Sequence, residues 1–183
     1  DDVARRIPSG WQDAGHNIYL LGATYDELDG SAWAGQIHNH LGGRPPVLDL
    51  ASEKRLAEAL AAASEQGLLA SAHDLSDGGL AQAVVESALR FDVGARIWLG
   101  EICERYSIDQ TAALFSESTS RALVTVGRED DVKFVGLCEA RGIPVLRVGV
   151  TQNVKELEIQ DIVTFTLGEL RKGWSSTIPA LFD

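Results

Sequence analysis

The sequence has few cysteines and no long apolar run. Only two of its 183 residues are cysteines, Cys103 and Cys138, which are too few for a disulfide framework or a cysteine-based zinc site. No apolar run approaches the roughly 20 residues that cross a bilayer. The first six residues also lack the basic start and apolar core of a secretory signal. We therefore expect a cytoplasmic protein without membrane contact.

Methionine and positive charge are the other shortages. There is no methionine, even at position 1, so we expect the chain to be a piece of something longer or a processed product. Lys and Arg number 16 against 27 Asp and Glu, a formal net charge of −11, and the basic residues occur as isolated pairs at 5–6, 54–55 and 171–172. Such a surface repels a nucleic-acid backbone, so we expect no nucleic-acid partner. Hydrophobic residues make up 45% of the chain, which is typical of a globular domain.

Short apolar stretches alternate along the chain with stretches of strong helix formers. We expect strands at 18–22, 68–72, 94–99, 121–126, 143–150 and 162–166. We expect helices at 31–41, 50–66, 80–91, 108–114, 130–141 and 167–172, and a hairpin around Gln152 and Asn153. The predicted class is α/β of the α+β type, with a mixed sheet and helices mainly on one face. Residues 17–183 would form this domain, with 1–16 as a linker or docking segment.

The most informative stretch is His-Asp-Leu-Ser-Asp-Gly-Gly at 73–79. A predicted strand ends there, two glycines permit positive φ and close approach, and a helix begins. The first turn of a helix leaves unpaired N–H groups and carries partial positive charge, so it accepts phosphate readily. A plainer interpretation is that Ser76 and Asp77 only cap the helix and that the glycines only turn the chain. Two carboxylates would also repel a bare phosphate unless Mg²⁺ or a basic group lay between them.

The motif His-Asp-Leu-Ser-Asp-Gly-Gly-Leu at 73–80 resembles the one in the last domain of phosphoribosylformylglycinamidine synthases. These enzymes belong to the superfamily of aminoimidazole ribonucleotide (AIR) synthetase, which also contains thiamine monophosphate kinase. The similarity extends to 18–31 and 45–50, so it covers nearly the whole chain and implies a fold like the AIR synthetase C-terminal domain. It also implies phosphate or nucleotide binding by Asp74, Ser76, Asp77, Gly78 and Gly79.

A second stretch, Leu-Phe-Ser-Glu-Ser-Thr-Ser-Arg at 114–121, also resembles the family. In the family's pseudo-symmetric partner domain the equivalent stretch contributes to substrate binding, which adds Glu117 and Ser118 to the expected site. Thr119 stands where a glutamine often occurs in the family. The alternative for this stretch is a solvated ion pair between Glu117 and Arg121, worth less than about 1 kcal/mol.

The reaction implied by the resemblance is the ATP-dependent conversion of formylglycinamide ribonucleotide (FGAR) and glutamine-derived ammonia to formylglycinamidine ribonucleotide, ADP and phosphate, in purine biosynthesis. ATP and Mg²⁺ would be bound mainly by domains outside this chain. We therefore assign no catalytic or metal residue here and expect the isolated chain to be inactive. The implied partners are the remaining domains, a glutaminase and small accessory subunits. Two alternatives are a non-catalytic structural or auxiliary nucleotide-site domain of that enzyme, and another superfamily enzyme such as thiamine monophosphate kinase.

Overall fold

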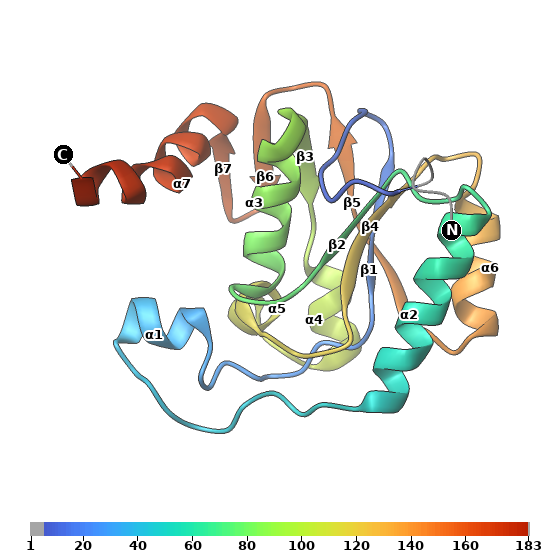
Figure 1. Ribbon diagram of the computed structural model, residues 1–183, viewed down its shortest axis with the longest axis horizontal. Helices are drawn as coiled ribbons and strands as arrows, with labels where there is room; N and C mark the ends of the chain where they lie inside the picture. The colour runs from blue at the N-terminus through green and yellow to red at the C-terminus, as the bar shows by residue number, and fades with distance from the viewer. Residues whose placement is uncertain (1–5, 183) are drawn as a thin grey trace.

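One seven-stranded mixed sheet organises residues 6–182, the part of the chain that this computed structural model describes (Figure 1). In chain order the strands are β1 (Asn17–Leu21), β2 (Ser71–Asp74), β3 (Gly94–Ile97), β4 (Ala122–Val126), β5 (Val145–Gln152), β6 (Glu156–Ile159) and β7 (Val163–Thr166). Across the sheet they run β2-β4-β1-β5-β3-β6-β7. Every neighbouring pair is antiparallel except β3 and β6, so the predicted mixed sheet is confirmed.

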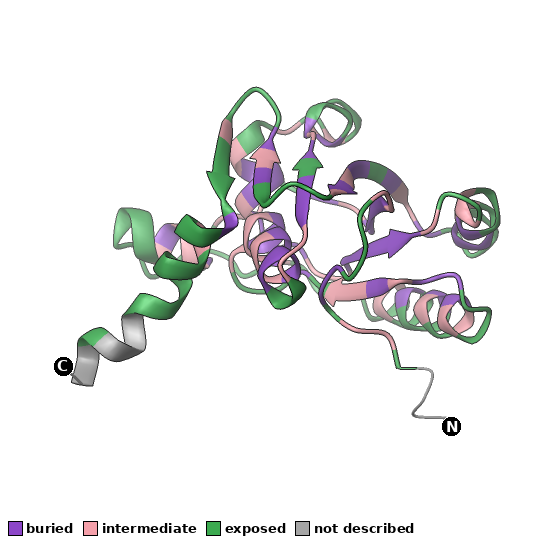
Figure 2. Ribbon diagram, turned by 90° about the horizontal axis from the view of Figure 1, so that it is seen from above, coloured by how far each residue is buried: buried purple, intermediate pink, exposed green. Residues whose placement is uncertain are grey.

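Helices cover both faces of this sheet. They are α1 (Ala32–His38), α2 (Leu50–Glu65), α3 (Gly79–Phe91), α4 (Gly100–Tyr106), α5 (Gln110–Phe115), α6 (Asp131–Ala140) and α7 (Leu167–Phe182). Helices α2 and α6 lie on one face and α3, α4 and α5 on the other (Figures 1 and 2). The α/β class with a mixed sheet is confirmed, and more of the helices pack on the face of α3 than on the face of α2.

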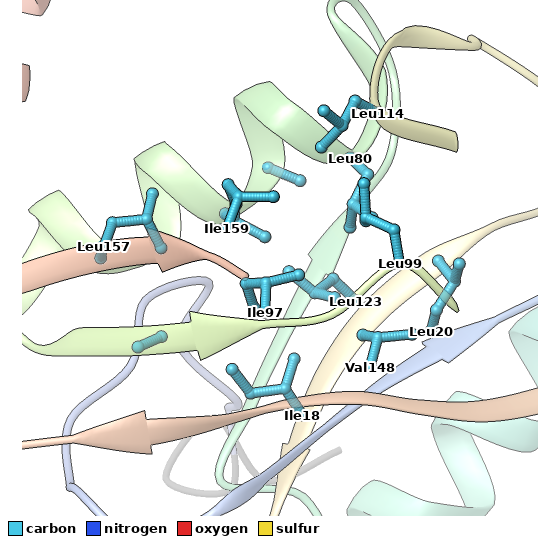
Figure 3. Close-up of a cluster of buried hydrophobic side chains, with 14 of the residues drawn as sticks. Ile18, Leu20, Leu80, Ile97, Leu99, Leu114, Leu123, Val148, Leu157 and Ile159 are labelled. Carbon is cyan, nitrogen blue, oxygen red and sulfur yellow. The ribbon is translucent and has the colours of Figure 1, made fainter. Parts of the chain in front are cut away.

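The central strand β1 shows why both faces need helices. All five of its residues are buried, so its side chains alternate between two apolar layers. Ile18 and Leu20 join the larger core cluster beneath α3 (Figure 3). Tyr19 and Leu21 join the opposite cluster, where the rings of Tyr19 and Phe134 lie 5.4 Å apart between centroids. A strand buried on both sides reads as a continuous apolar run, so the apolar residues of β1 fit a sheet that is covered on both faces.

Two elements were not expected, and one connection differs. Helix α4 and strand β6 had no counterpart in the prediction, and α7 extends well past the expected end at Lys172. The hairpin expected around Gln152 and Asn153 is wrong, because β5 and β6 lie on opposite sides of β3 and do not pair. Strand β2 also begins and ends later than expected and includes His73 and Asp74.

The described part of the expected linker or docking segment lies against the domain. Trp11 is 1% exposed within the core beneath α3, and its amide donates to Ser87 O at 3.0 Å. Pro8 O accepts a bond of 2.9 Å from the amide of Ala72, which covers part of the free edge of β2. Residues 8–11 are therefore integrated in the fold.

None of the helices among the described residues is long and apolar enough to cross a bilayer.

Candidate functional site

The predicted corner between a buried strand and a helix is present. Strand β2 ends at Asp74, and α3 begins at Gly79 after a turn in which Gly78 has φ 76°. Gly79 has φ +60°, and a Cβ there would lie 2.4 Å from the carbonyl oxygen of Ser116. No other residue type fits that space without moving the backbone of residues 114–116. The second glycine thus allows α3 to pack against the end of α5.

A pocket of about 370 Å³ opens beside this corner. Its walls come from the corner, the next turn of α3 and the start of α1: Ala32, His73, Asp74, Ser76, Asp77, Gly78, Gly79, Gln82, Ala83 and Glu86. Asp74, Ser76 and Asp77 are exposed, whereas Gly79 is buried in the floor. Five of the seven residues expected to bind phosphate or nucleotide therefore come together on one open surface.

The carboxylate of Glu117 binds backbone amides at the corner. Its Oε1 atom accepts two hydrogen bonds of 2.8 Å, from the amide of Gly78 and from the amide of Ala32. The amide of Gly79 donates to Ser76 O at 3.0 Å. The protein itself thus engages the two glycine amides that were expected to meet phosphate, and it places a carboxylate at the start of α3.

Ser118 and Arg121 are buried beneath the corner and outside the pocket. Ser118 is fully buried, and its Oγ accepts from the amide of Tyr25 at 3.0 Å. Arg121 is 3% exposed and donates to the carbonyl oxygens of Ser118 and Ser116, at 2.8 and 2.6 Å. The alternative of a solvated Glu117–Arg121 ion pair is therefore wrong: the guanidinium binds backbone and the carboxylate binds amides. Burial lowers the pKa of Arg121 to about 10, an effect that Glu27 and Glu117 partly offset.

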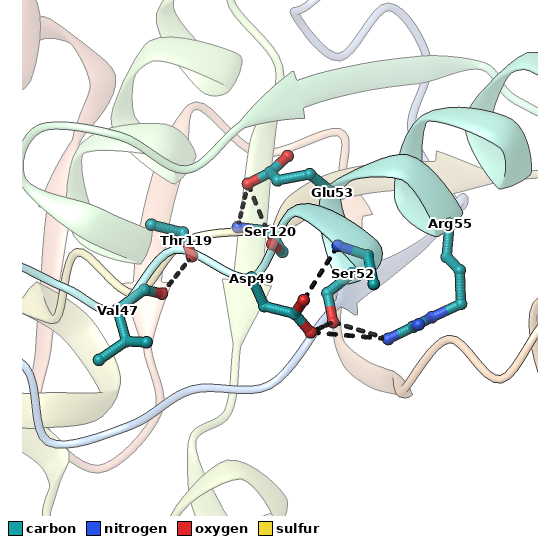
Figure 4. A network of polar contacts seen from close by, with 8 residues as sticks. Val47, Asp49, Ser52, Glu53, Arg55, Thr119 and Ser120 are labelled. Atoms are coloured by element: carbon teal, nitrogen blue, oxygen red, sulfur yellow. Dashed lines mark hydrogen bonds and ion pairs between the residues drawn. The ribbon is translucent and has the colours of Figure 1, made fainter.

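The segment that carries Glu117 is also fixed to α2 and to the chain just before it (Figure 4). Thr119 Oγ1 donates to Val47 O at 2.8 Å. Glu53 Oε1 accepts from the amide and the hydroxyl of Ser120, at 2.8 and 3.0 Å. Since Arg121 holds the same segment from within, the backbone on either side of Glu117 is firmly placed.

His73 braces β2 against α3. Its Nε2 lies 3.1 Å from Glu86 Oε2, and Glu86 Oε1 accepts from Gln82 Nε2 at 2.8 Å. His73 and Glu86 also line a second pocket of about 350 Å³, whose other walls include Arg90 and Arg171. The acidic pocket at the corner and this second pocket, which contains two guanidinium groups, therefore share His73 and Glu86 as lining residues.

The chemistry of the corner differs from that of a simple phosphate cradle. Asp74, Asp77 and Glu86 bring negative charge to the pocket, which repels a bare phosphate. Among residues 6–182, no group of three or more His, Cys, Asp or Glu side chains has the geometry to hold a metal ion. The described residues of the corner therefore do not by themselves form a complete Mg²⁺ site.

Five residues that line this pocket were not among the expected binding residues: Ala32, His73, Gln82, Ala83 and Glu86. Gln82 and Glu86 follow Gly78 at intervals of four residues, which places them on one face of the predicted helix, so their signal was available. Ala32 had no such signal, because α1 reaches the corner only through the fold.

The sequence matches one family model and a set of known relatives. Residues 13–162 match the family model described as AIR synthase related protein, C-terminal domain. The chain is 64% identical, over its whole length, to the phosphoribosylformylglycinamidine synthase subunit PurL of Leifsonia xyli subsp. xyli, and it spans 24% of that protein.

Solved structures show the same fold at lower identity. The Thermotoga maritima PurL complexed with FGAR is 21% identical, with a TM-score of 0.80 over 92% of this chain and 30% of the other. The same protein complexed with ATP gives a TM-score of 0.72 at 20% identity, over 92% of this chain and 27% of the other. The predicted resemblance to phosphoribosylformylglycinamidine synthases is confirmed.

Proposed function

The chain belongs to the family of AIR synthase related protein C-terminal domains, and from this premise we propose that it is the last domain of a phosphoribosylformylglycinamidine synthase. The whole enzyme would convert FGAR, ATP and glutamine-derived ammonia to formylglycinamidine ribonucleotide, ADP and phosphate. The high identity to a PurL subunit supports this proposal. Because the chain spans about a quarter of that relative's length, the remaining domains would supply the catalytic groups and most ATP and Mg²⁺ contacts. A cytoplasmic glutaminase and small accessory subunits would complete the ammonia supply.

The open pocket at the β2–α3 corner is the observation that carries a binding role for this domain. We propose that it forms one wall of a ligand site that another domain completes. Asp74, Ser76 and Asp77 are exposed side chains that line this space, and Gly78 and Gly79 line it with backbone. Glu117 and Ser118 act from beneath: Glu117 holds the amide of Gly78, and Ser118 holds the segment around it.

Charge determines what such a wall can do. Carboxylates accept hydrogen bonds from ribose hydroxyls or take part in a cation site shared with another domain, whereas a bare phosphate needs positive partners. In the described part of the chain, Arg90 and Arg171 line the adjoining pocket. We therefore propose that the sugar of a ribonucleotide lies at the acidic corner. Its phosphate would be met by a cation or by guanidinium groups, and not by the amides of Gly78 and Gly79.

A non-catalytic scaffold remains the second candidate, because one observation favours it. The amides of Gly78 and Gly79 are already engaged within the protein, as in a corner that serves packing alone. A scaffold would tolerate a change at the exposed Asp77 side chain, whereas a ligand wall would not.

Filling the pocket in the intact synthase tests the proposal. Asp77→Trp adds bulk at an exposed position, and we expect it to raise the KM for FGAR or ATP by roughly tenfold or more. Asp77→Asn, which removes the charge without adding bulk, separates the two effects. Glu65→Trp is the matched control, since Glu65 is an exposed acidic residue at the end of α2 and does not line the pocket. Unchanged kinetics in Asp77→Trp would favour the scaffold.

A further inference from the structure

Helix α1 is held to the body of the domain by few contacts. Ala34 is its only buried residue, and Figure 1 shows the helix set apart from the sheet on the side of the corner. The chain around it, residues 30–43, leaves and returns at one place, where Asp29 Oδ2 accepts from the amide of Arg44 at 3.2 Å. Positive φ at Gly30 (+68°) and Gly43 (+94°) marks the two ends of this segment. Residues 30–43 therefore form a loop-like excursion from the domain, and its two ends meet at a base formed by Asp29 and Arg44.

Two contacts join this excursion to the corner. The amide and the hydroxyl of Ser31 donate to Leu28 O beside the base. Among the described residues, the one hydrogen bond from 30–43 to a distant part of the chain is donated by the amide of Ala32 to Glu117 Oε1 at 2.8 Å. The ring of Trp33 stacks on that of Phe115, with centroids 4.4 Å apart and planes inclined by 21°. Both partners lie in the short stretch 115–117, which packs against Gly79.

The same carboxylate oxygen ties this excursion to the pocket. Glu117 Oε1 also accepts from the amide of Gly78 at 2.8 Å, so a single atom joins the first residue of α1 to the residue before α3. Ala32 lines the pocket. Moving α1 away would therefore remove a wall of the pocket and leave Glu117 with one of its two donors.

Glu117 itself has little freedom to follow such a movement. Ser120 is bonded to Glu53 of α2, and Arg121 is bonded to two carbonyl oxygens of the same segment. Within this chain the excursion is the weakly held side of this contact, because its residues 36–43 are all exposed. Few buried contacts and an exposed backbone are the features of a segment that opens at low free-energy cost.

We propose that Glu117 is a positioning residue that latches residues 30–43 over the corner pocket, so that α1 is a movable wall of the ligand site. Only the last part rests on the proposed function; the latch itself follows from the contacts of Glu117. Glu117 then acts on a ligand through α1 and Gly78, without touching the ligand.

Hydrogen–deuterium exchange of the intact synthase tests the latch. In Glu117→Ala, the amides of 31–38 should exchange roughly tenfold faster, because about one buried hydrogen bond to a charged group is lost. Amides of β4 should be unchanged. Glu117→Gln keeps an acceptor oxygen at the same place and should stay close to the wild type. Unchanged exchange at 31–38 in Glu117→Ala would overturn the proposal, and so would an equal rise in β4, which would mark Glu117 as a residue of general stability.

A second variant keeps the proposal testable if Glu117→Ala does not fold. Trp33→Ala removes the ring stack and leaves the bond between Glu117 and Gly78, so it should speed exchange at 31–38 but not at the corner. Equal acceleration at both places would contradict the proposed geometry.

Saturating FGAR or a non-hydrolysable ATP analogue separates the two proposals. In the wild type one of these ligands should slow exchange at 31–38, and in Glu117→Ala its KM should rise while kcat changes less. If the variants loosen α1 as expected but neither ligand affects 31–38 or 73–79, the latch stands and the proposed binding role of the pocket fails.

Discussion

The carboxylate of Glu117 lies 2.8 Å from the amide nitrogen of Gly78, although 39 residues separate the two in sequence. This contact determines which hydrogen-bonding groups of the corner remain free. A helix start that was expected to offer its amides to a phosphate already holds an anionic side chain of the same domain. The exposed carboxylates of Asp74 and Asp77, and not the glycine amides, are the groups that the corner leaves open to the pocket.

Gly79 is a packing residue as well as a turn residue, and its substitution has a defined cost. An added Cβ would lie 2.4 Å from Ser116 O and 2.9 Å from Leu114 O, at a φ of +60°. We expect Gly79→Ala to lower the free energy of unfolding by on the order of 2–4 kcal/mol, measured by urea unfolding of the chain. Gly136→Ala is the control, since Gly136 lies within α6 with nothing within 4 Å of an added Cβ. It should stabilise by about 0.5–1 kcal/mol, and a loss in Gly79→Ala no larger than about 0.5 kcal/mol would contradict the packing role.

Trp11 tests whether the amino-terminal segment belongs to the domain. It is 1% exposed in the main core cluster, so Trp11→Ala should cost about 3–5 kcal/mol of stability. Trp174→Ala is the same change at a side chain that is 61% exposed, and it should cost less than about 1 kcal/mol. Equal urea midpoints for the two variants would show that residues 8–11 are a detachable linker.

Tyr19 predicts a particular dependence of stability on alkaline pH. Burial raises the pKa of its phenol from 10.0 to about 12, and Asp131 adds to the rise. Between these values the folded chain keeps a proton that the unfolded chain has released. The contribution of Tyr19 to stability is therefore complete below pH 10.0 and is lost as the pH rises towards about 12.

Urea unfolding between about pH 9 and about pH 11.5 measures this loss. Tyr19→Phe should flatten the decline in that range, whereas the control Tyr25→Phe, at a side chain that is 58% exposed, should follow the wild type. Identical slopes in all three proteins would show that the phenol of Tyr19 titrates alike in the folded and unfolded chains.

Local signals in the sequence were enough to predict the corner. The apolar run at 68–72, the glycine pair and the amphipathic stretch from Leu80 identify a strand, a turn and a helix through short-range steric and hydrophobic rules. The α/β class followed from the alternation of such stretches. The family resemblance, and not the local pattern, suggested a ribonucleotide ligand for this corner.

Long-range contacts account for what the sequence did not reveal. Arginine is rarely buried, so the burial of Arg121 beneath the pocket has no local signature. The parallel pairing of β6 with β3 depends on strand order, which no local pattern encodes. The approach of α1 to Glu117 likewise exists only once the sheet is assembled.

Substituting Gly78 would not isolate ligand binding, since its φ is +76° and an added Cβ would lie 2.8 Å from Gln82 Cβ.

A structure of the intact synthase with FGAR and a non-hydrolysable ATP analogue bound is the most direct test of the central claim, that the β2–α3 corner is one wall of a ligand site. If the corner is such a wall, one ligand lies within hydrogen-bond distance of Asp74, Ser76 or Asp77, and another domain closes the far side. Both ligands bound elsewhere, with the corner facing only solvent or packed protein, would contradict it.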